Sequence, residues 1–137
     1  MCAFRMSNDL KNALCGNVIS YIAGADGTDG LLTISAGPQP GDAGSDGTGG
    51  TLCVIGGIAW NSTTSGTASL ASTTGYAGTA IAAGTAGWGR LEYVGTAGTC
   101  RIDGDIGTSA AHVFMINVNN FSSGGVITLL SADIYMA

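Results

Sequence analysis

Charge is scarce in this sequence. Asp, Glu, Lys and Arg together make up 9% of its 137 residues, whereas they make up about 25% of an average soluble domain. Residues 47–89 contain none of the four. A surface with so little charge is poorly protected against sticking to other proteins. We therefore expect much of this surface to be covered by other subunits.

Basic residues are fewer than acidic residues, and this restricts the kinds of partner that the protein can bind. The chain has 4 Lys and Arg against 9 Asp and Glu, a net charge of −5. So few cations argue against a nucleic-acid partner and against an anionic membrane surface. No apolar run is long enough to span a bilayer. The segment Met1–Met6 is too short for a signal peptide, so we expect a chain made and assembled in a cytoplasm.

Catalytic motifs are absent as well. The sequence has no GxSxG elbow, no phosphate-binding loop and a single histidine, His112, beside Val113 and Phe114. Asp103 and Asp105 form a close carboxylate pair, but glycosidases usually take their two carboxylates from different elements. We therefore predict that the protein is not an enzyme.

Metal-binding patterns are missing too. No CxxC pair or Cys/His cluster is present, which argues against a zinc site. The early acidic residues do not follow the ligand spacing of a calcium loop, so we expect no metal and no cofactor. In a reducing cytoplasm the four cysteines should be thiols. Their spacing in the sequence does not decide whether any two of them form a disulfide. The four are Cys2, Cys15, Cys53 and Cys100.

The first predicted element is a helix over residues 7–23. Ser7, Asn8 or Asp9 can cap its N-terminus, and Gly24 can cap its C-terminus. An apolar residue recurs every four positions, as expected of one helix face; the stripe is Leu10, Leu14, Val18 and Ile22, and the polar side holds Lys11, Asn12 and Asn17. The stripe packs either against the chain's own domain or onto a neighbouring subunit.

Short strand-like segments follow the helix. They are residues 31–35, 52–60, 67–83 (two strands broken near Thr74-Gly75), 88–94, 99–106, 113–118 and 126–136. Residues 37–50 contain both prolines and read as a long loop. Seven or eight antiparallel strands with Gly-rich turns predict one all-β domain over residues 1–137, a jelly-roll-like β-sandwich at 31–137 with the helix as an appendage. An immunoglobulin-like sandwich is also compatible.

The segment 99–106 shows the clearest alternation. Cys100, Ile102, Gly104 and Ile106 fall on one face of the predicted strand, and Arg101, Asp103 and Asp105 fall on the other. Such a pattern is typical of a half-buried strand. We expect the charged face to be solvated, with Arg101 in a surface ion pair or in a turn there.

Several runs carry a resemblance. They are GWGR (87–90), DGDIGTS (103–109) and VITLLSADI (126–134), together with the asparagine-bearing helix at 10–14, the strand LLTI (31–34) and the Pro/Gly/Asp loop at 38–46. Over nearly the whole chain these segments resemble a family of small virion structural proteins of tailed bacteriophages. Members usually carry a Trp-Phe-Arg-like segment, in which Gly89 here replaces the aromatic residue.

The resemblance implies a structural role in a virion and leaves head or tail open. We expect a capsid decoration (cement) protein that binds the major capsid protein and itself, as a homotrimer on the head lattice. The expected contact residues are Leu10, Leu14 and Val18 in the helix, Pro38 and Pro40 in the loop, and Trp60 and Trp88. The alternative is a tail or fibre component that binds host glycans through Trp60, Trp88 and Tyr93.

Overall fold

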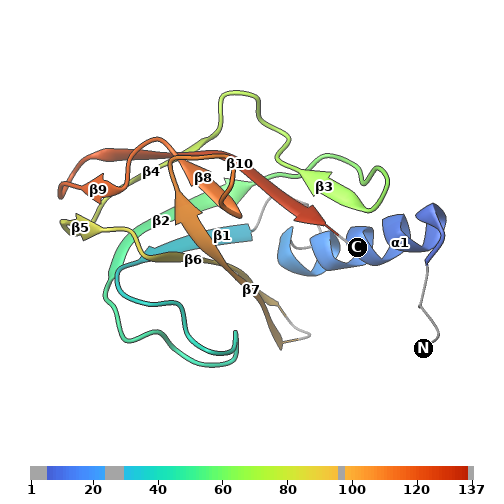
Figure 1. The fold of residues 1–137 in the computed structure, drawn as a ribbon, viewed down its shortest axis with the longest axis horizontal. Helices are drawn as coiled ribbons and strands as arrows, with labels where there is room; N and C mark the ends of the chain where they lie inside the picture. Colours follow the sequence, from blue (N-terminus) through green and yellow to red (C-terminus); the bar gives the residue numbers. More distant parts are fainter. Residues whose placement is uncertain (1–5, 24–29, 96–97, 136–137) are drawn as a thin grey trace.

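A computed structural model describes residues 6–23, 30–95 and 98–135 of the chain. It contains one N-terminal helix and a curled sheet of eight strands (Figure 1). The predicted fold class, an all-β domain of the sandwich type with an N-terminal helix, is confirmed.

The helix α1 (Asn8–Ala23) begins where a capping residue was predicted. Of the three candidates, Ser7 is the cap: its hydroxyl accepts a hydrogen bond from the Leu10 N–H (3.3 Å), and its carbonyl accepts one from the Lys11 N–H (3.0 Å). Asp9 then stands in the first turn, where a negative charge suits the helix dipole. The predicted cap at Gly24 lies outside the described residues.

The strands follow the predicted segments closely. They are β1 (Gly30–Ser35), β2 (Thr51–Ile58), β3 (Thr67–Ser69), β4 (Tyr76–Thr79), β5 (Gly84–Thr85), β6 (Trp88–Gly95), β7 (Gly98–Gly107), β8 (Phe114–Ile116), β9 (Asn120–Phe121) and β10 (Val126–Tyr135). The pair β5–β9 was not predicted, because two-residue strands leave no periodic signal. Gly56-Gly57 form a bulge: Gly30 pairs with Ile58 but Leu32 pairs with Ile55.

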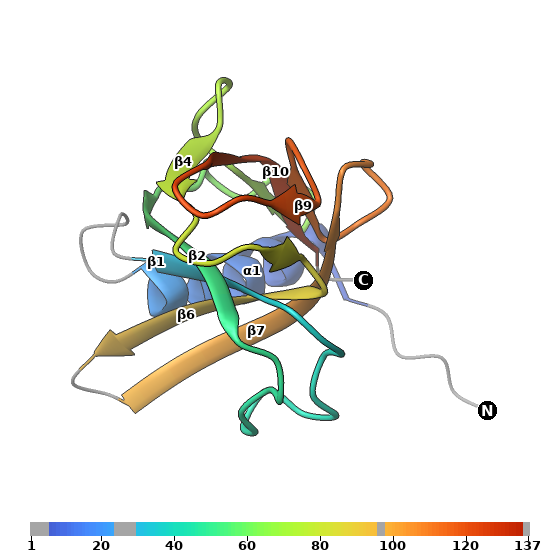
Figure 2. The same ribbon diagram turned by 90° about the vertical axis from the view of Figure 1, so that its left-hand side faces the viewer.

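The main sheet has the order β2-β1-β6-β7-β8-β10-β3, and β4 also pairs with β10. The predicted antiparallel arrangement is wrong for one pair, since β8 runs parallel to β7. The sheet curls until β4 lies beside β2 (Figure 2). At this point the backbones of Cys53 and Ala80 form an isolated antiparallel β-bridge. This closeness depends on a glycine, because a Cβ at Gly78 would stand 2.6 Å from the Val54 carbonyl oxygen.

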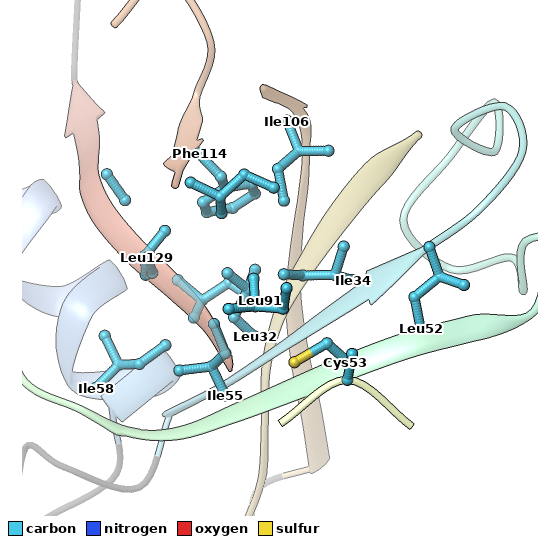
Figure 3. Close-up of a cluster of buried hydrophobic side chains, with 14 of the residues drawn as sticks. Leu32, Ile34, Leu52, Cys53, Ile55, Ile58, Leu91, Ile106, Phe114 and Leu129 are labelled. Carbon is cyan, nitrogen blue, oxygen red and sulfur yellow. The ribbon is translucent and has the colours of Figure 1, made fainter. Parts of the chain in front are cut away.

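The core fills the inside of the curl (Figure 3). Its largest fully buried side chain is Phe114, packed in one cluster with Leu32, Leu91 and Leu129. Gly89 and Gly104 are directly paired across β6 and β7, and a Cβ on either would approach the Phe114 ring to 2.9 or 3.0 Å. Gly89 therefore leaves space that Phe114 occupies.

The helix packs on its own sheet, but only in part through the predicted stripe. Leu10 and Leu14 are exposed, whereas Cys15 is fully buried and Val18 packs against the core. Asn12, predicted on the polar side, faces the sheet: its Oδ1 accepts a hydrogen bond from the Gly66 N–H (2.7 Å), and its carbonyl accepts one from the Thr63 hydroxyl (3.1 Å). The prediction that Asn12 lies on the solvent-facing polar side is wrong, because these two hydrogen bonds orient the helix so that Asn12 points inward.

Candidate interaction surfaces

The outer face of α1 is apolar and exposed. Leu10, Leu14 and Tyr21 are 46%, 40% and 57% exposed. Residues 4 and 11 positions after Leu10 return to the same side of a helix, so the three form one stripe, with the uncharged Asn17 between them. We call these four residues the helix stripe. Exposed apolar residues that line up on one face mark an interaction site more often than scattered ones do.

Charged side chains gather on the outer face of β6 and β7. Arg90 lies directly opposite Asp103, and Glu92 lies directly opposite Arg101. Cross-strand neighbours of opposite charge stabilise a sheet and help fix its register. We call these four residues the charged grid. Among the described residues, three of the four ion pairs involve at least one residue of the grid, and two of them join residues within it.

The pair Arg90–Asp103 is buried. Arg90 Nε and Nη2 donate to the two carboxylate oxygens of Asp103, each at 2.7 Å, and the two side chains are 7% and 4% exposed. Hydrogen bonding to Asp103 raises the pKa of Arg90, and burial opposes that rise. The guanidinium carbon also lies 5.0 Å from the centroid of the Trp88 ring, a cation–π distance.

The predicted solvated face of β7 is therefore wrong at Asp103. Arg101 does form a partly exposed ion pair, with Glu92 on β6 (Nε–Oε2 3.1 Å). A segment of the chain covers the neighbouring Arg90–Asp103 pair, which alternation along one strand does not reveal. That segment is residues 36–50, here called the 36–50 loop.

The 36–50 loop is fastened to the grid by backbone carbonyls. Arg90 Nη2 donates to the Ser45 carbonyl (2.7 Å), and Arg101 Nη1 reaches the Gly44 carbonyl (3.5 Å). The Ala36 N–H donates to the Gly50 carbonyl (3.0 Å) and closes the neck of the loop. A hollow of about 240 Å³ remains between loop and sheet. The loop is thus a fixed feature of the surface, held by charges that point away from the core.

Glycines let the 36–50 loop lie close to the sheet and to itself. A Cβ at Gly47 would overlap the Trp88 ring, and a Cβ at Gly49 would overlap the Ala36 carbonyl. Near the loop tip, Asp42 accepts hydrogen bonds from the Gly44 N–H (2.7 Å) and the Ser45 hydroxyl (3.0 Å). The Ser45 hydroxyl and then the Gly44 N–H lower the pKa of Asp42.

The lone histidine fixes a turn. His112 Nδ1 lies 2.8 Å from Asp105 Oδ2, and Asp105 Oδ1 accepts a hydrogen bond from the Val113 N–H (2.9 Å). The Val113 N–H and then His112 lower the pKa of Asp105. The imidazole rests on Gly107, where a Cβ would overlap the ring. This arrangement holds the turn that leads from β7 into the parallel strand β8.

The predicted contact residues do not share one surface. Leu10 and Leu14 are exposed on α1, Val18 is partly buried on the same helix, and Pro38 and Pro40 are accessible in the 36–50 loop. Trp60 is partly buried against the core. Trp88 is 3% exposed, so its side chain is not accessible to a partner and this part of the prediction is corrected. Tyr21 was missed, although its distance of 11 residues from Leu10 places it on the stripe.

The described part of the chain gives little indication of a metal site or a membrane-spanning helix. Within it, no group of three or more His, Cys, Asp or Glu side chains could hold a metal ion, and no helix is long and apolar enough to cross a membrane. Cys15 and Cys53 are free and buried, and burial raises the pKa of both thiols. The side chains of Cys2 and Cys100 lie outside the described residues.

Comparison with known proteins identified no match among protein-family models, curated proteins or solved structures.

Proposed function

We propose that the protein is a structural subunit of a tailed-phage virion, a decoration protein that binds the major capsid protein and its own copies as a homotrimer on the head lattice. The observation that carries this proposal is the helix stripe, which is uncharged, contains three large apolar side chains and is exposed on the side of α1 that faces away from the sheet.

Burial of the helix stripe is energetically favourable for a protein-protein contact. Apolar area removed from water contributes about 25 cal/mol per Å², whereas an unpaired charge at an interface is costly to desolvate. The stripe contains no charged residue. The charges of the grid are already paired within the chain, so covering nearby surface leaves no new charge unpaired.

The 36–50 loop supports the same proposal from another part of the surface. Its exposed Pro38 and half-exposed Pro40 are held in place by the fastening at Ser45 and by the closed neck. A loop that is ordered before binding loses less conformational entropy when a partner covers it. Weak contacts repeated over a lattice then reinforce one another through multivalency.

The glycan-binding alternative has less support from the described residues. It relied on Trp60, Trp88 and Tyr93 as an exposed aromatic surface. Trp88 is buried, Trp60 packs against the core and Tyr93 is partly buried. These three side chains therefore do not provide the open aromatic face that stacking on a sugar requires.

The test is assembly onto capsids. Leu14→Ser and Tyr21→Ser, on the helix stripe, should fold normally and lose most of their binding to decoration-free capsids, measured by co-sedimentation. Leu130→Ser is the matched control, because Leu130 is similarly exposed (41%) but lies on β10. Equal binding by all three variants, or recovery of the chain only from separated tails, would contradict the proposal.

A further inference from the structure

A second hollow lies beside the turn that His112 fixes. It has a volume of about 500 Å³ and is lined by Ala110, Ala111, His112, Val113, Ser131, Asp133 and Tyr135. Small-molecule sites usually occupy about 300–1,000 Å³ and combine apolar walls with a few convergent polar groups. None of the proposed capsid contacts lies in this hollow, which we call the His112 hollow.

The strand register explains why these residues meet. Ser131, Asp133 and Tyr135 alternate along β10 and therefore share one face of the strand. Phe114, the first residue of β8, pairs with Ala132. The residues just before β8, His112 and Val113, therefore come beside the end of β10. Polar groups from two distant parts of the chain converge here through the sheet itself.

The lining offers both hydrogen-bonding capacity and an aromatic ring. Tyr135 is 66% exposed. In the described part of the chain, Asp133 forms no ion pair, and the side chains of Ser131 and Tyr135 form no hydrogen bond. His112 is held in orientation by Asp105. Among the described residues, the hollow thus combines a carboxylate and two hydroxyls that have no side-chain partner, an oriented imidazole and an open ring face.

We propose that the His112 hollow binds a neutral saccharide. Sugar hydroxyls both donate and accept hydrogen bonds, as do the Ser131 and Tyr135 hydroxyls, and they donate to a carboxylate such as Asp133. The apolar face of a sugar ring can cover the Tyr135 ring. An anionic ligand would meet Asp133 with like charge, and an amine would leave the donors of the hollow unmatched. This activity goes beyond virion assembly and uses none of the residues of the helix stripe.

Ligand-observed NMR tests the proposal on the whole chain. The probes are methyl glycosides of glucose, galactose, mannose and N-acetylglucosamine and their disaccharides, with N-acetyl-lysine methylamide as the amine probe. We expect at least one saccharide to bind. Asp133→Asn should weaken this binding about tenfold or more, as for loss of a charged hydrogen bond, and Tyr135→Ala should abolish it while Tyr135→Phe retains part of it.

Asp9→Asn is the matched control, because Asp9 is an exposed aspartate in the first turn of α1; it should bind saccharide like the unaltered chain. Three outcomes would overturn the proposal. They are no binding by any saccharide of the panel, binding by the amine probe alone, and saccharide binding that Asp133→Asn and Tyr135→Ala leave unchanged.

Discussion

At the scale of single residues, two of the few charged side chains form a buried ion pair. Arg90 and Asp103 lie on the outer face of a sheet, yet both side chains are almost fully buried. An exposed ion pair on such a face would contribute little to the free energy of folding. A buried ion pair stabilises weakly relative to apolar residues, but removal of one partner leaves an uncompensated charge. The structure of the 36–50 loop depends on this pair, because Arg90 also holds the Ser45 carbonyl.

Asp103→Ala should therefore lower the free energy of unfolding by about 3–5 kcal/mol. Arg101→Ala is the comparison, since the Arg101–Glu92 pair is partly exposed and should cost about 1 kcal/mol or less. Urea unfolding measures both. In the double variant Arg90→Ala/Asp103→Ala the loss should be smaller than the sum of the two single losses. Equal losses for Asp103→Ala and Arg101→Ala would show that the burial of the first pair has no energetic consequence.

At the scale of elements, alternation along the chain was enough to locate most strands. The segment 126–136 is an example: β10 covers Val126–Tyr135. The predicted faces hold only as far as Leu129, because a register shift between Leu129 and Ser131 makes Ala132 the next buried residue. Periodicity did not reveal which face of α1 is inside. Asn12 decides this orientation through bonds to residues more than 50 positions away, and no local pattern carries that information.

The charged grid could be predicted only in part for the same reason. The alternation of Arg101, Asp103 and Asp105 correctly placed them on one face of β7. Their partners depend on the register between β6 and β7, and the burial of Asp103 depends on the 36–50 loop. The helix stripe was also predicted only in part: the apolar periodicity included Leu10 and Leu14 but not Tyr21, and the exposure of all three became clear only from the packing of α1.

Two neighbouring glycines test how closely the 36–50 loop must fit. Gly49→Ala places a Cβ on the Ala36 carbonyl, so it should destabilise the protein by about 1–3 kcal/mol, as for other overpacked sites. Gly50→Ala meets nothing within 4 Å and should be neutral or slightly stabilising. Thermal unfolding followed by tryptophan fluorescence compares the two. Similar melting temperatures for both variants would mean that the neck of the loop opens freely.

At the scale of the whole molecule, the lowered pKa values predict the response to acid. Asp42 and Asp105 have lowered pKa values in the folded state, whereas an unfolded aspartate titrates near about 3.9. Their contribution to stability is therefore fully present above that pH and is lost as the pH falls through the lowered values. The urea midpoint should drop below about pH 4, and Asp105→Asn should reduce this drop. A midpoint that rises in acid would contradict the prediction.

The place of β10 in the sheet has a consequence for synthesis on the ribosome. This strand pairs with β3, β4 and β8 and accepts a hydrogen bond from Cys15 at the Ile134 carbonyl (3.5 Å). The strands β1, β2, β6 and β7 pair with one another within residues 30–107, and β7 pairs in addition with β8. The nascent chain can thus form this four-stranded part early. The strands β3 and β4, which pair with β10 in the main sheet, cannot complete that pairing until residues 126–135 leave the exit tunnel.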